Sequence, residues 1–270
     1  MAVFDYWMGK APMIISIPHA GLKIPSNIAA RMTDTGLANV DADWHVDRLY
    51  SFAQDMGITM LKGRYSRYVI DLNRPPDGGP LYDGHVDTGL CPTQAFDGAP
   101  LYVAGGEPRH EEIAERKQKY WDPYHEALQA EINRLKEEHG TVLLFEAHSI
   151  KSMVPRLFDG HLPQMCFGTD DGRSATAELT AAMMEYVREN SDYRAVLNDR
   201  FKGGYITRKY GAPERGVHAV QLELSQATYL YEDDINGDAG PMFNTGRAVT
   251  LEPFLKGMVE FMLESETHSH

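Results

Sequence analysis

Three reactive side chains lie where apolar runs of the sequence stop. His19 closes the run IISIPH, His148 closes TVLLFEAH, and Glu223 lies near the end of AVQLELS. Side chains at the carboxyl ends of neighbouring strands in an α/β sheet face one crevice, so groups far apart in sequence can converge there. Two histidines and a carboxylate at such an edge are typical of a metal-assisted hydrolase.

The two histidines, His19 and His148, are the expected ligands of a divalent metal ion. Hydrolytic zinc takes three ligands from His, Asp and Glu and leaves a fourth position for water. The third ligand is expected from DADWHVD, which offers Asp43, His45 and Asp47. We predict Asp47, because a place in the first turns of a helix can point it back to the strand end, whereas Asp43 could equally cap that helix. Either histidine alone could instead be structural.

Glu223 is the predicted general base. A carboxylate flanked by leucines is either paired structurally, for example with an arginine, or held in a site with a raised pKa. In a site it would take a proton from the attacking water and pass one to the departing amine. Glu146 is the competing acid. Because side chains alternate along a strand, it shares a face with His148 and could instead orient that histidine.

Arginines and glycines are the expected contacts to an anionic substrate. RYSRYVIDLNRPP contains Arg67 and Arg74, and SMVPRLFDG contains Arg156. The planar guanidinium group suits a carboxylate, although each of the three could be structural. In FKGGY, Gly203 and Gly204 would let backbone amides approach a carboxylate.

Composition limits the class of protein. The chain has 270 residues and a formal net charge of −13, which argues against nucleic acid as a partner. No apolar run approaches the roughly 20 residues that span a bilayer, and MAVFDYWMGKAP does not read as a secretory signal. Two cysteines, Cys91 and Cys166, fit a reducing compartment. We therefore expect a single cytoplasmic domain over residues 1–270, without a membrane or nucleic-acid partner; the oligomeric state stays open.

Strands and helices alternate along the sequence. Strands are expected at 13–18, 58–63, 66–73, 141–149, 194–199 and 218–225. Helices are expected at 43–56, 108–139, 173–190 and 245–264, with a kink or restart near Asp122-Pro123. This order predicts an α/β fold with a central mixed, mostly parallel sheet covered on both faces by helices, in three αβα layers.

Two loops interrupt this alternation. The Pro/Gly-rich stretch at about 75–106 is too long for a simple connection, so we expect it to form part of the active-site wall. The segment 201–218 is expected to be a second, glycine-rich loop.

Six blocks along the chain resemble the N-formylglutamate amidohydrolase (N-formylglutamate deformylase) family. They are ISIPHAG, DADWHVDRLY, YSRYVIDLNRPP, AHSIKSMVPRLFDG, NDRFKGGYITRKYG and VQLELSQATYLYED. The resemblance implies hydrolysis of N-formyl-L-glutamate to formate and L-glutamate, in bacterial histidine degradation. It also implies a phosphorylase/hydrolase-like fold similar to zinc carboxypeptidases, with one divalent metal ion, expected to be zinc.

The likeness to carboxypeptidases also suggests roles for particular residues. Those enzymes bind zinc through His, an acidic residue and His beside a Glu base, which implies His19, Asp47, His148 and Glu223. Their Asn-Arg pair for a substrate carboxylate implies Asn73 and Arg74. The sequence departs from that pattern after His19, where Gly21 and Leu22 stand in place of a nearby acidic ligand.

The expected partner is a small dicarboxylate substrate, because two carboxylates and a formamide need cationic contacts and a polarised carbonyl. An alternative is a deacylase or carboxypeptidase-like hydrolase that acts on another N-acylated acidic amino acid. A non-catalytic binding protein with a retained amino-acid pocket is a third hypothesis. His and Asp ligation also accepts cobalt, manganese or iron.

Overall fold

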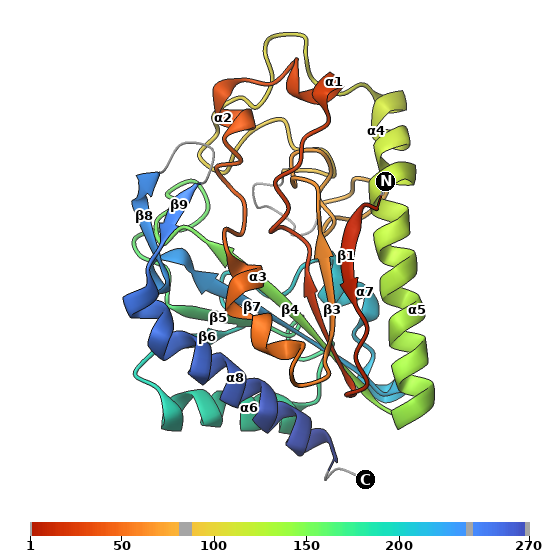
Figure 1. Ribbon diagram of the computed structural model, residues 1–270, viewed down its shortest axis with the longest axis vertical. Helices are drawn as coiled ribbons and strands as arrows, with labels where there is room; N and C mark the ends of the chain where they lie inside the picture. Colours follow the sequence, from red (N-terminus) through yellow and green to blue (C-terminus); the bar gives the residue numbers. More distant parts are fainter. Residues whose placement is uncertain (1, 81–87, 236–239, 268–270) are drawn as a thin grey trace.

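A seven-stranded mixed sheet forms the centre of the computed structural model, which describes residues 2–80, 88–235 and 240–267 (Figure 1). The strand order is β1-β3-β2-β4-β7-β5-β6. Four central strands run parallel: β3 (Thr59–Gly63), β2 (Met13–Ile17), β4 (Val142–Ile150) and β7 (Val217–Ser225). The outer strands are β1 (Phe4–Trp7), antiparallel to β3, β5 (Met165–Gly168), antiparallel to β7, and β6 (Ala195–Leu197), parallel to β5.

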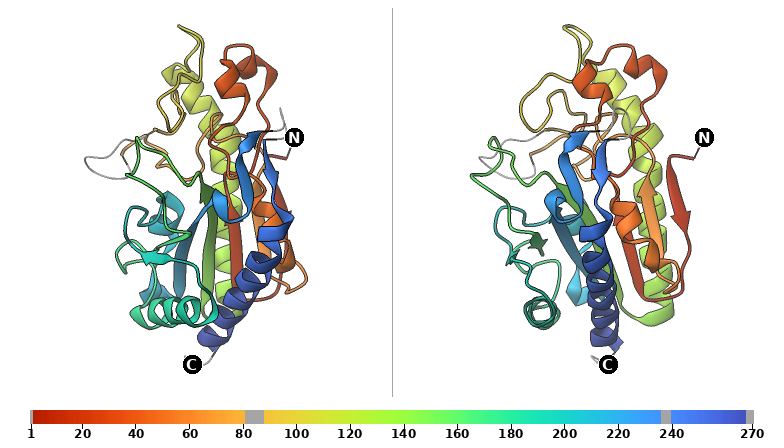
Figure 2. Two further views of the ribbon diagram at one scale, coloured as in Figure 1. Left: turned by 90° about the vertical axis from the view of Figure 1, so that its left-hand side faces the viewer. Right: turned by 60° about the vertical axis from the view of Figure 1, so that its left-hand side comes forward.

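Helices cover both faces of this sheet, and each face has its own apolar core. One core lies beneath α3 (Val46–Leu49), α6 (Ala177–Asn190) and α8 (Thr245–Thr267). The other lies beneath α5 (Asp122–His139) and α7 (Tyr205–Tyr210). Figures 1 and 2 show α5 and α8 on opposite sides of the strands. The predicted three-layer αβα fold with a mixed, mostly parallel sheet is therefore confirmed.

Short elements complete the structure. They are α1 (Ser26–Ala29), α2 (Asp34–Leu37), α4 (His110–Arg116), a π-helical turn (Lys117–Trp121), three 3-10 turns (Ser51–Ala53, Pro213–Arg215, Gln226–Thr228) and a hairpin of β8 (Leu230–Ile235) and β9 (Pro241–Phe243). Over the described ranges, no helix has the length and apolar character to cross a membrane.

The alternation of side chains along β4 decides which residues face the site. Leu143, Phe145 and Ala147 belong to the core beneath α8, whereas Val142 and Leu144 belong to the core beneath α5 and α7. The following even-numbered residues, Glu146 and His148, therefore project on the α7 side.

β7 extends the same arrangement. Its register with β4 pairs Gln221 with Glu146 and Glu223 with His148. Because paired residues of neighbouring parallel strands share a face, these four polar side chains lie together at the carboxyl edge of the sheet.

Several predicted elements are wrong. Residues 66–73 form turns instead of a strand, and the predicted glycine-rich loop at 201–218 contains α7. The apolar residues of the first segment, Tyr68, Val69 and Ile70, are consecutive and all buried. Such a short run carries no period, so a strand and a buried turn look alike in the sequence. The helix expected at 43–56 is reduced to α3 and one 3-10 turn.

The chain also continues without a break from His110 to His139, where a kink or restart was expected at Asp122-Pro123. Pro123 lies in the first turn of α5, directly after the π-helical turn. Proline has no N–H to contribute, and a π-turn just before it changes the local hydrogen-bond spacing, so the helical path is kept.

Candidate active site

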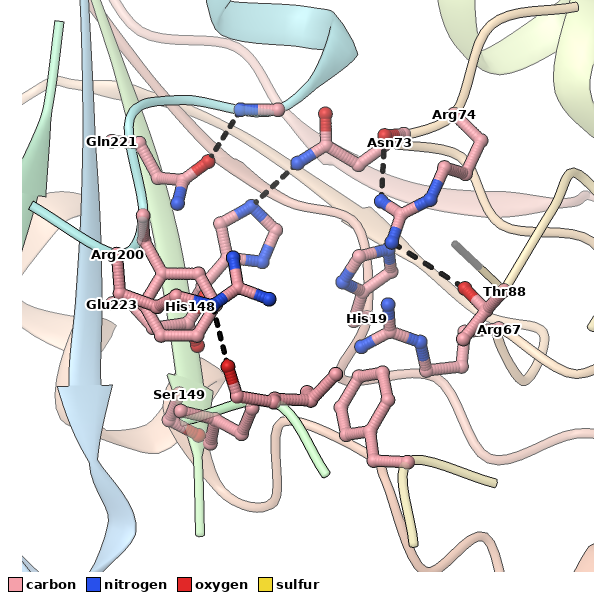
Figure 3. A pocket seen from close by; sticks show the side chains of 15 residues that line it. His19, Arg67, Asn73, Arg74, Thr88, His148, Ser149, Arg200, Gln221 and Glu223 are labelled. Carbon is pink, nitrogen blue, oxygen red and sulfur yellow. Dashed lines mark hydrogen bonds between the residues drawn. The ribbon is translucent and has the colours of Figure 1, made fainter. Parts of the chain in front are cut away.

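The carboxyl ends of β2, β4 and β7 border a pocket (Figure 3). β4 contributes His148, β7 contributes Gln221 and Glu223, and the segment after β2 contributes His19. The remaining lining residues are Arg67, Asn73, Arg74, Thr88, Phe96, Ser149, Ile150, Leu157, Arg200, Phe201 and Gly204. Reactive side chains from distant parts of the sequence thus meet at one edge of the sheet.

Within the described part of the chain, three buried side chains form a group that could hold a metal ion. One ligand atom each from His19, Asp43 and His148 lies within 4.8 Å of the other two. Oδ2 of Asp43 is 3.7 Å from Nδ1 of His19 and 2.9 Å from Nδ1 of His148. The backbone N–H of Asp43 donates to the carbonyl of His19 at 3.1 Å, which ties the two chain segments together.

The state of the His19 ring fits a bound cation. Its Nε2 lies 2.7 Å from Oδ1 of Asp71, a carboxylate that can only accept, so Nε2 carries the hydrogen and Nδ1 presents a lone pair. Within the described residues that Nδ1 is buried without a hydrogen-bond partner. Burial, followed by the charge of Arg67, lowers the pKa of His19, which keeps the ring neutral. A buried nitrogen lone pair without a hydrogen-bond partner is suited to bind a metal ion. Tetrahedral zinc with bonds of about 2 Å holds its ligand atoms about 3.3 Å apart.

The His148 ring is held from its other side. Its Nε2 lies 3.3 Å from Oε1 of Glu146 and 3.1 Å from Nδ2 of Asn73. Thr207 donates to the second oxygen of Glu146 at 2.8 Å. Burial opposes protonation of His148, yet Asp43 and Glu146 hold its pKa well above the usual range. Glu146 lies where a carboxylate that orients His148 was expected.

Asp43, rather than Asp47, lies beside the two histidines, which corrects the predicted acidic ligand. The Asp47 side chain is 38% exposed and accepts from Nζ of Lys62 at 2.8 Å. His45 is placed elsewhere too, since its Nε2 lies 3.1 Å from the carbonyl of Pro241. The reason is the local path of the chain, because His45 has φ 60° and α3 begins only after it. Asp47 therefore lies on α3, and Asp43 lies in the buried turn before it.

Glu223 has the properties of a group that exchanges protons near neutral pH. It lines the pocket beside His148, its partner in the strand register. Burial raises the pKa of Glu223 to about 8, with a further increase from Asp43, while His148 and Arg67 oppose the rise. A cation held by the three ligands would add a positive charge and lower this pKa.

A fully buried carboxylate, Asp71, links His19 to two arginines. Its Oδ2 accepts from Nη2 of Arg67 at 2.7 Å and lies 4.0 Å from Nη1 of Arg74. The backbone N–H of Asn73 donates to its Oδ1 at 2.9 Å. Although burial opposes ionisation, His19, Arg67 and Arg74 hold the pKa of Asp71 well below its usual range. Arg67, Asn73 and Arg74 thus lie in the pocket, as their predicted role requires.

The third arginine of the pocket is Arg200 instead of Arg156, which is a second correction. Arg156 is exposed and donates to the carbonyl of Ala95 and to Oε1 of Gln94. Arg200 lines the pocket, and its Nε donates to the carbonyl of Leu157 at 2.7 Å. The sequence signal for it was its place in the block NDRFKGGYITRKYG.

Of the glycine pair, Gly204 lines the pocket but does not present a free amide, and the contact of the pair with a substrate carboxylate stays a prediction. The N–H of Gly204 already donates to Oε1 of Gln221 at 2.7 Å. A Cβ at Gly204 would lie 2.1 Å from Nδ2 of Asn73, so glycine is needed for Asn73 to approach. Gly203 has φ 120° and is not among the residues that line the pocket.

A comparison of the sequence with protein families matches residues 11–230 to the model of N-formylglutamate amidohydrolases. The chain belongs to the N-formylglutamate amidohydrolase family. Among the curated relatives of this chain is an N-formylglutamate deformylase of Pseudomonas aeruginosa. It is 47% identical over 250 residues, which cover 93% of this chain and 94% of that protein. Another, from Pseudomonas putida, is 44% identical over 232 residues, 86% of each chain.

Solved structures agree with the family assignment at the level of the fold. The crystal structure of an N-formylglutamate amidohydrolase from Ralstonia eutropha JMP134 has a TM-score of 0.82 and 23% identity, and all of both chains is covered. A gene product of Agrobacterium tumefaciens has a TM-score of 0.71 and 18% identity, with 97% of this chain and 94% of that one covered.

In this family member, the long loop predicted at about 75–106 reaches the pocket through Thr88 and Phe96. Phe96 lies under the guanidinium group of Arg67, whose Cζ is 4.7 Å from the ring centroid. Residues 81–87 of the loop are outside the described part of the chain. That residues 1–270 form a single domain stays a prediction.

Proposed function

We propose that this chain hydrolyses the formamide bond of N-formyl-L-glutamate to formate and L-glutamate, and that it needs one divalent metal ion, zinc in the first instance. The observation that carries the proposal is the meeting of His19, Asp43 and His148 with Glu223 in a pocket that three arginines also line. The names of the two Pseudomonas relatives agree with it.

The arginines suit a substrate with two carboxylates. Arg67 and Arg74 lie around Asp71 near His19, and Arg200 enters from the 198–204 segment (Figure 3). In a protein with a net charge of −13, three guanidinium groups in one pocket favour an anionic ligand against the overall field. We assign the two substrate carboxylates to these three side chains.

The acidic and imidazole groups would carry out the reaction. His19, Asp43 and His148 would hold the metal ion, which when bound supplies Lewis acidity to water and to the formyl oxygen. Glu223 takes a proton from the attacking water and delivers it to the nitrogen of the departing glutamate. Asp71 and Glu146, which lie at Nε2 of the two imidazole rings, would keep the ring hydrogens there and leave each Nδ1 available to the ion.

The test is formate release from N-formyl-L-glutamate by purified protein as prepared, after chelation, and after zinc is restored. We expect activity that disappears with the chelator and returns with zinc. N-acetyl-L-glutamate and N-formyl-L-glutamine, which change the acyl group and remove one carboxylate, are the matched substrates. Faster turnover of the acetyl compound would favour the alternative deacylase, and formate release unaffected by chelation would contradict the metal requirement.

The sequence resemblance also supports a place for this reaction in histidine degradation, which we include in the proposal. Growth of a deletion strain on histidine as nitrogen source, with and without the gene restored, tests it.

A further inference from the structure

Asp43 lies in a turn outside the named helices and strands, yet its side chain is only 2% exposed. Its proposed role as a ligand requires that the carboxylate stay next to two histidines on other segments. A turn is held by fewer backbone hydrogen bonds than a strand, so other contacts must fix its position.

Two buried side chains donate to the backbone carbonyls of the residues on either side of Asp43. Gln226 donates from Nε2 to the carbonyl of Ala42 at 3.0 Å, and Tyr229 donates from its hydroxyl to the carbonyl of Trp44 at 2.7 Å. Gln226 and Tyr229 are 2% and 0% exposed. Together with the Asp43 N–H bond to His19, these contacts hold the turn from three directions.

Ser149, next to the ligand His148 on β4, joins the two donors into one chain. Its Oγ is 3.3 Å from Nε2 of Gln226 and 2.6 Å from the hydroxyl oxygen of Tyr229. The Tyr229 hydroxyl has a single hydrogen, and the Trp44 carbonyl can only accept, so Ser149 must donate to Tyr229. Hydrogen bonds then run in one direction from Gln226 through Ser149 and Tyr229 to Trp44.

We propose that Gln226, Ser149 and Tyr229 are positioning residues that fix the backbone around Asp43 and thereby set the affinity of the chain for its metal ion. The inference rests on the proposed metal site. Loss of a partner that supports a metal ligand commonly weakens metal binding by about 10–100-fold. None of the three needs to contact the ion, because each acts through the position of Asp43.

The test compares zinc dissociation constants, measured by chelator competition, for Tyr229→Phe and for Tyr50→Phe. Tyr50 is a matched control: it is 0% exposed, belongs to the same apolar core as Tyr229, and has no hydrogen-bond partner for its hydroxyl among the described residues. All proteins would carry His268→Ala and His270→Ala, so that no imidazole of the C-terminal residues competes for added zinc. We expect Tyr229→Phe to weaken zinc binding by about 10–100-fold and Tyr50→Phe to change it less than about twofold.

A second readout separates positioning from general damage. At saturating zinc, kcat of Tyr229→Phe should return to within about twofold of the unmutated value, because the ligands themselves are intact. Gln226→Met removes the donor to Ala42 and should also weaken zinc binding about tenfold, which decides the matter if Tyr229→Phe fails to fold.

Equal zinc affinity in the unmutated, Tyr229→Phe and Gln226→Met proteins would overturn the inference while leaving the metal site intact. Equal weakening by Tyr50→Phe and Tyr229→Phe would also overturn it. No zinc binding by the unmutated protein would overturn the proposed metal site itself.

Discussion

Replacement of Glu223 by Gln should stabilise the metal-free protein at alkaline pH, although it removes the proposed base. Burial raises the pKa of Glu223 from its ordinary value of 4.5 to about 8. Between these values the folded protein keeps a proton that the unfolded chain releases, so the free energy of unfolding falls as pH rises. A shift of about 3.5 pKa units corresponds to about 5 kcal/mol at 1.36 kcal/mol per unit. Glu223 is half-buried, and contact with solvent weakens such effects. We therefore expect Glu223→Gln to be more stable than the unmutated protein by about 2–5 kcal/mol at alkaline pH.

The assay is urea unfolding of chelator-treated protein at pH 5, 6.5 and 8. Glu223→Gln should gain stability over the unmutated protein as pH rises, from little difference near pH 5 to the full difference near pH 8. Glu185→Gln is the control, because Glu185 forms an exposed ion pair with Arg188 and its side chain is 60% exposed. That variant should stay within about 0.5 kcal/mol of the unmutated protein at every pH.

Two further readouts connect this stability to catalysis. Added zinc should reduce the advantage of Glu223→Gln, because a nearby cation lowers the pKa of the carboxyl. With zinc bound, kcat should fall by about 10²–10⁴-fold, the usual contribution of a general base. A pH-independent difference between the two proteins would refute the raised pKa, and an unchanged kcat would refute the assignment of Glu223 as base.

Three other perturbations test separate parts of the structure. Asp43→Asn should weaken zinc binding by at least about 100-fold and Asp47→Asn should not, as measured by chelator competition; the reverse order would restore the prediction made from sequence. Trp121→Phe removes the indole N–H that donates to the carbonyl of Arg74 at 3.2 Å. The KM for N-formyl-L-glutamate should therefore rise about fivefold with kcat unchanged. An unchanged KM would show that this hydrogen bond does not position Arg74. Burial lowers the pKa of His125 to about 4, so the neutral ring contributes its full stability above the usual pKa of 6.5, and this stability is lost as pH falls through 4. Between pH 6.5 and 4 the free energy of unfolding of His125→Gln should therefore fall by about 3 kcal/mol less than that of the unmutated protein, as measured by urea unfolding. Parallel pH dependences of the two proteins would refute this.

Local sequence pattern determined the strands of the site and the faces of their side chains. The apolar runs that end at His19, His148 and Glu223 correspond to β2, β4 and β7, and the period of two put Glu146 beside His148. These features depend on residues adjacent in sequence, and the carboxyl edge of a parallel sheet brings such strand ends together by geometry alone.

Only the tertiary structure decides which loop residues lie in the site. Asp43 and Asp47 are four residues apart in one short segment, and the choice between them depends on bonds to His19, Gln226 and Tyr229. These partners are distant in sequence from Asp43 and Asp47, so no local sequence pattern can predict the contacts with them.

The arginines show the same division. Arg67 and Arg74 were predicted because both belong to the arginine-rich block RYSRYVIDLNRPP. Asp71, which lies between them in the sequence, holds both near His19. Arg156 and Arg200 were indistinguishable by residue type. Contacts with other segments decided that Arg200 lines the pocket, whereas Arg156 is exposed and donates to Ala95 and Gln94. Sequence alone thus located the strand ends and the candidate side chains on them. Loop packing, which depends on contacts between distant segments, decided which acid and which arginine lie beside those side chains.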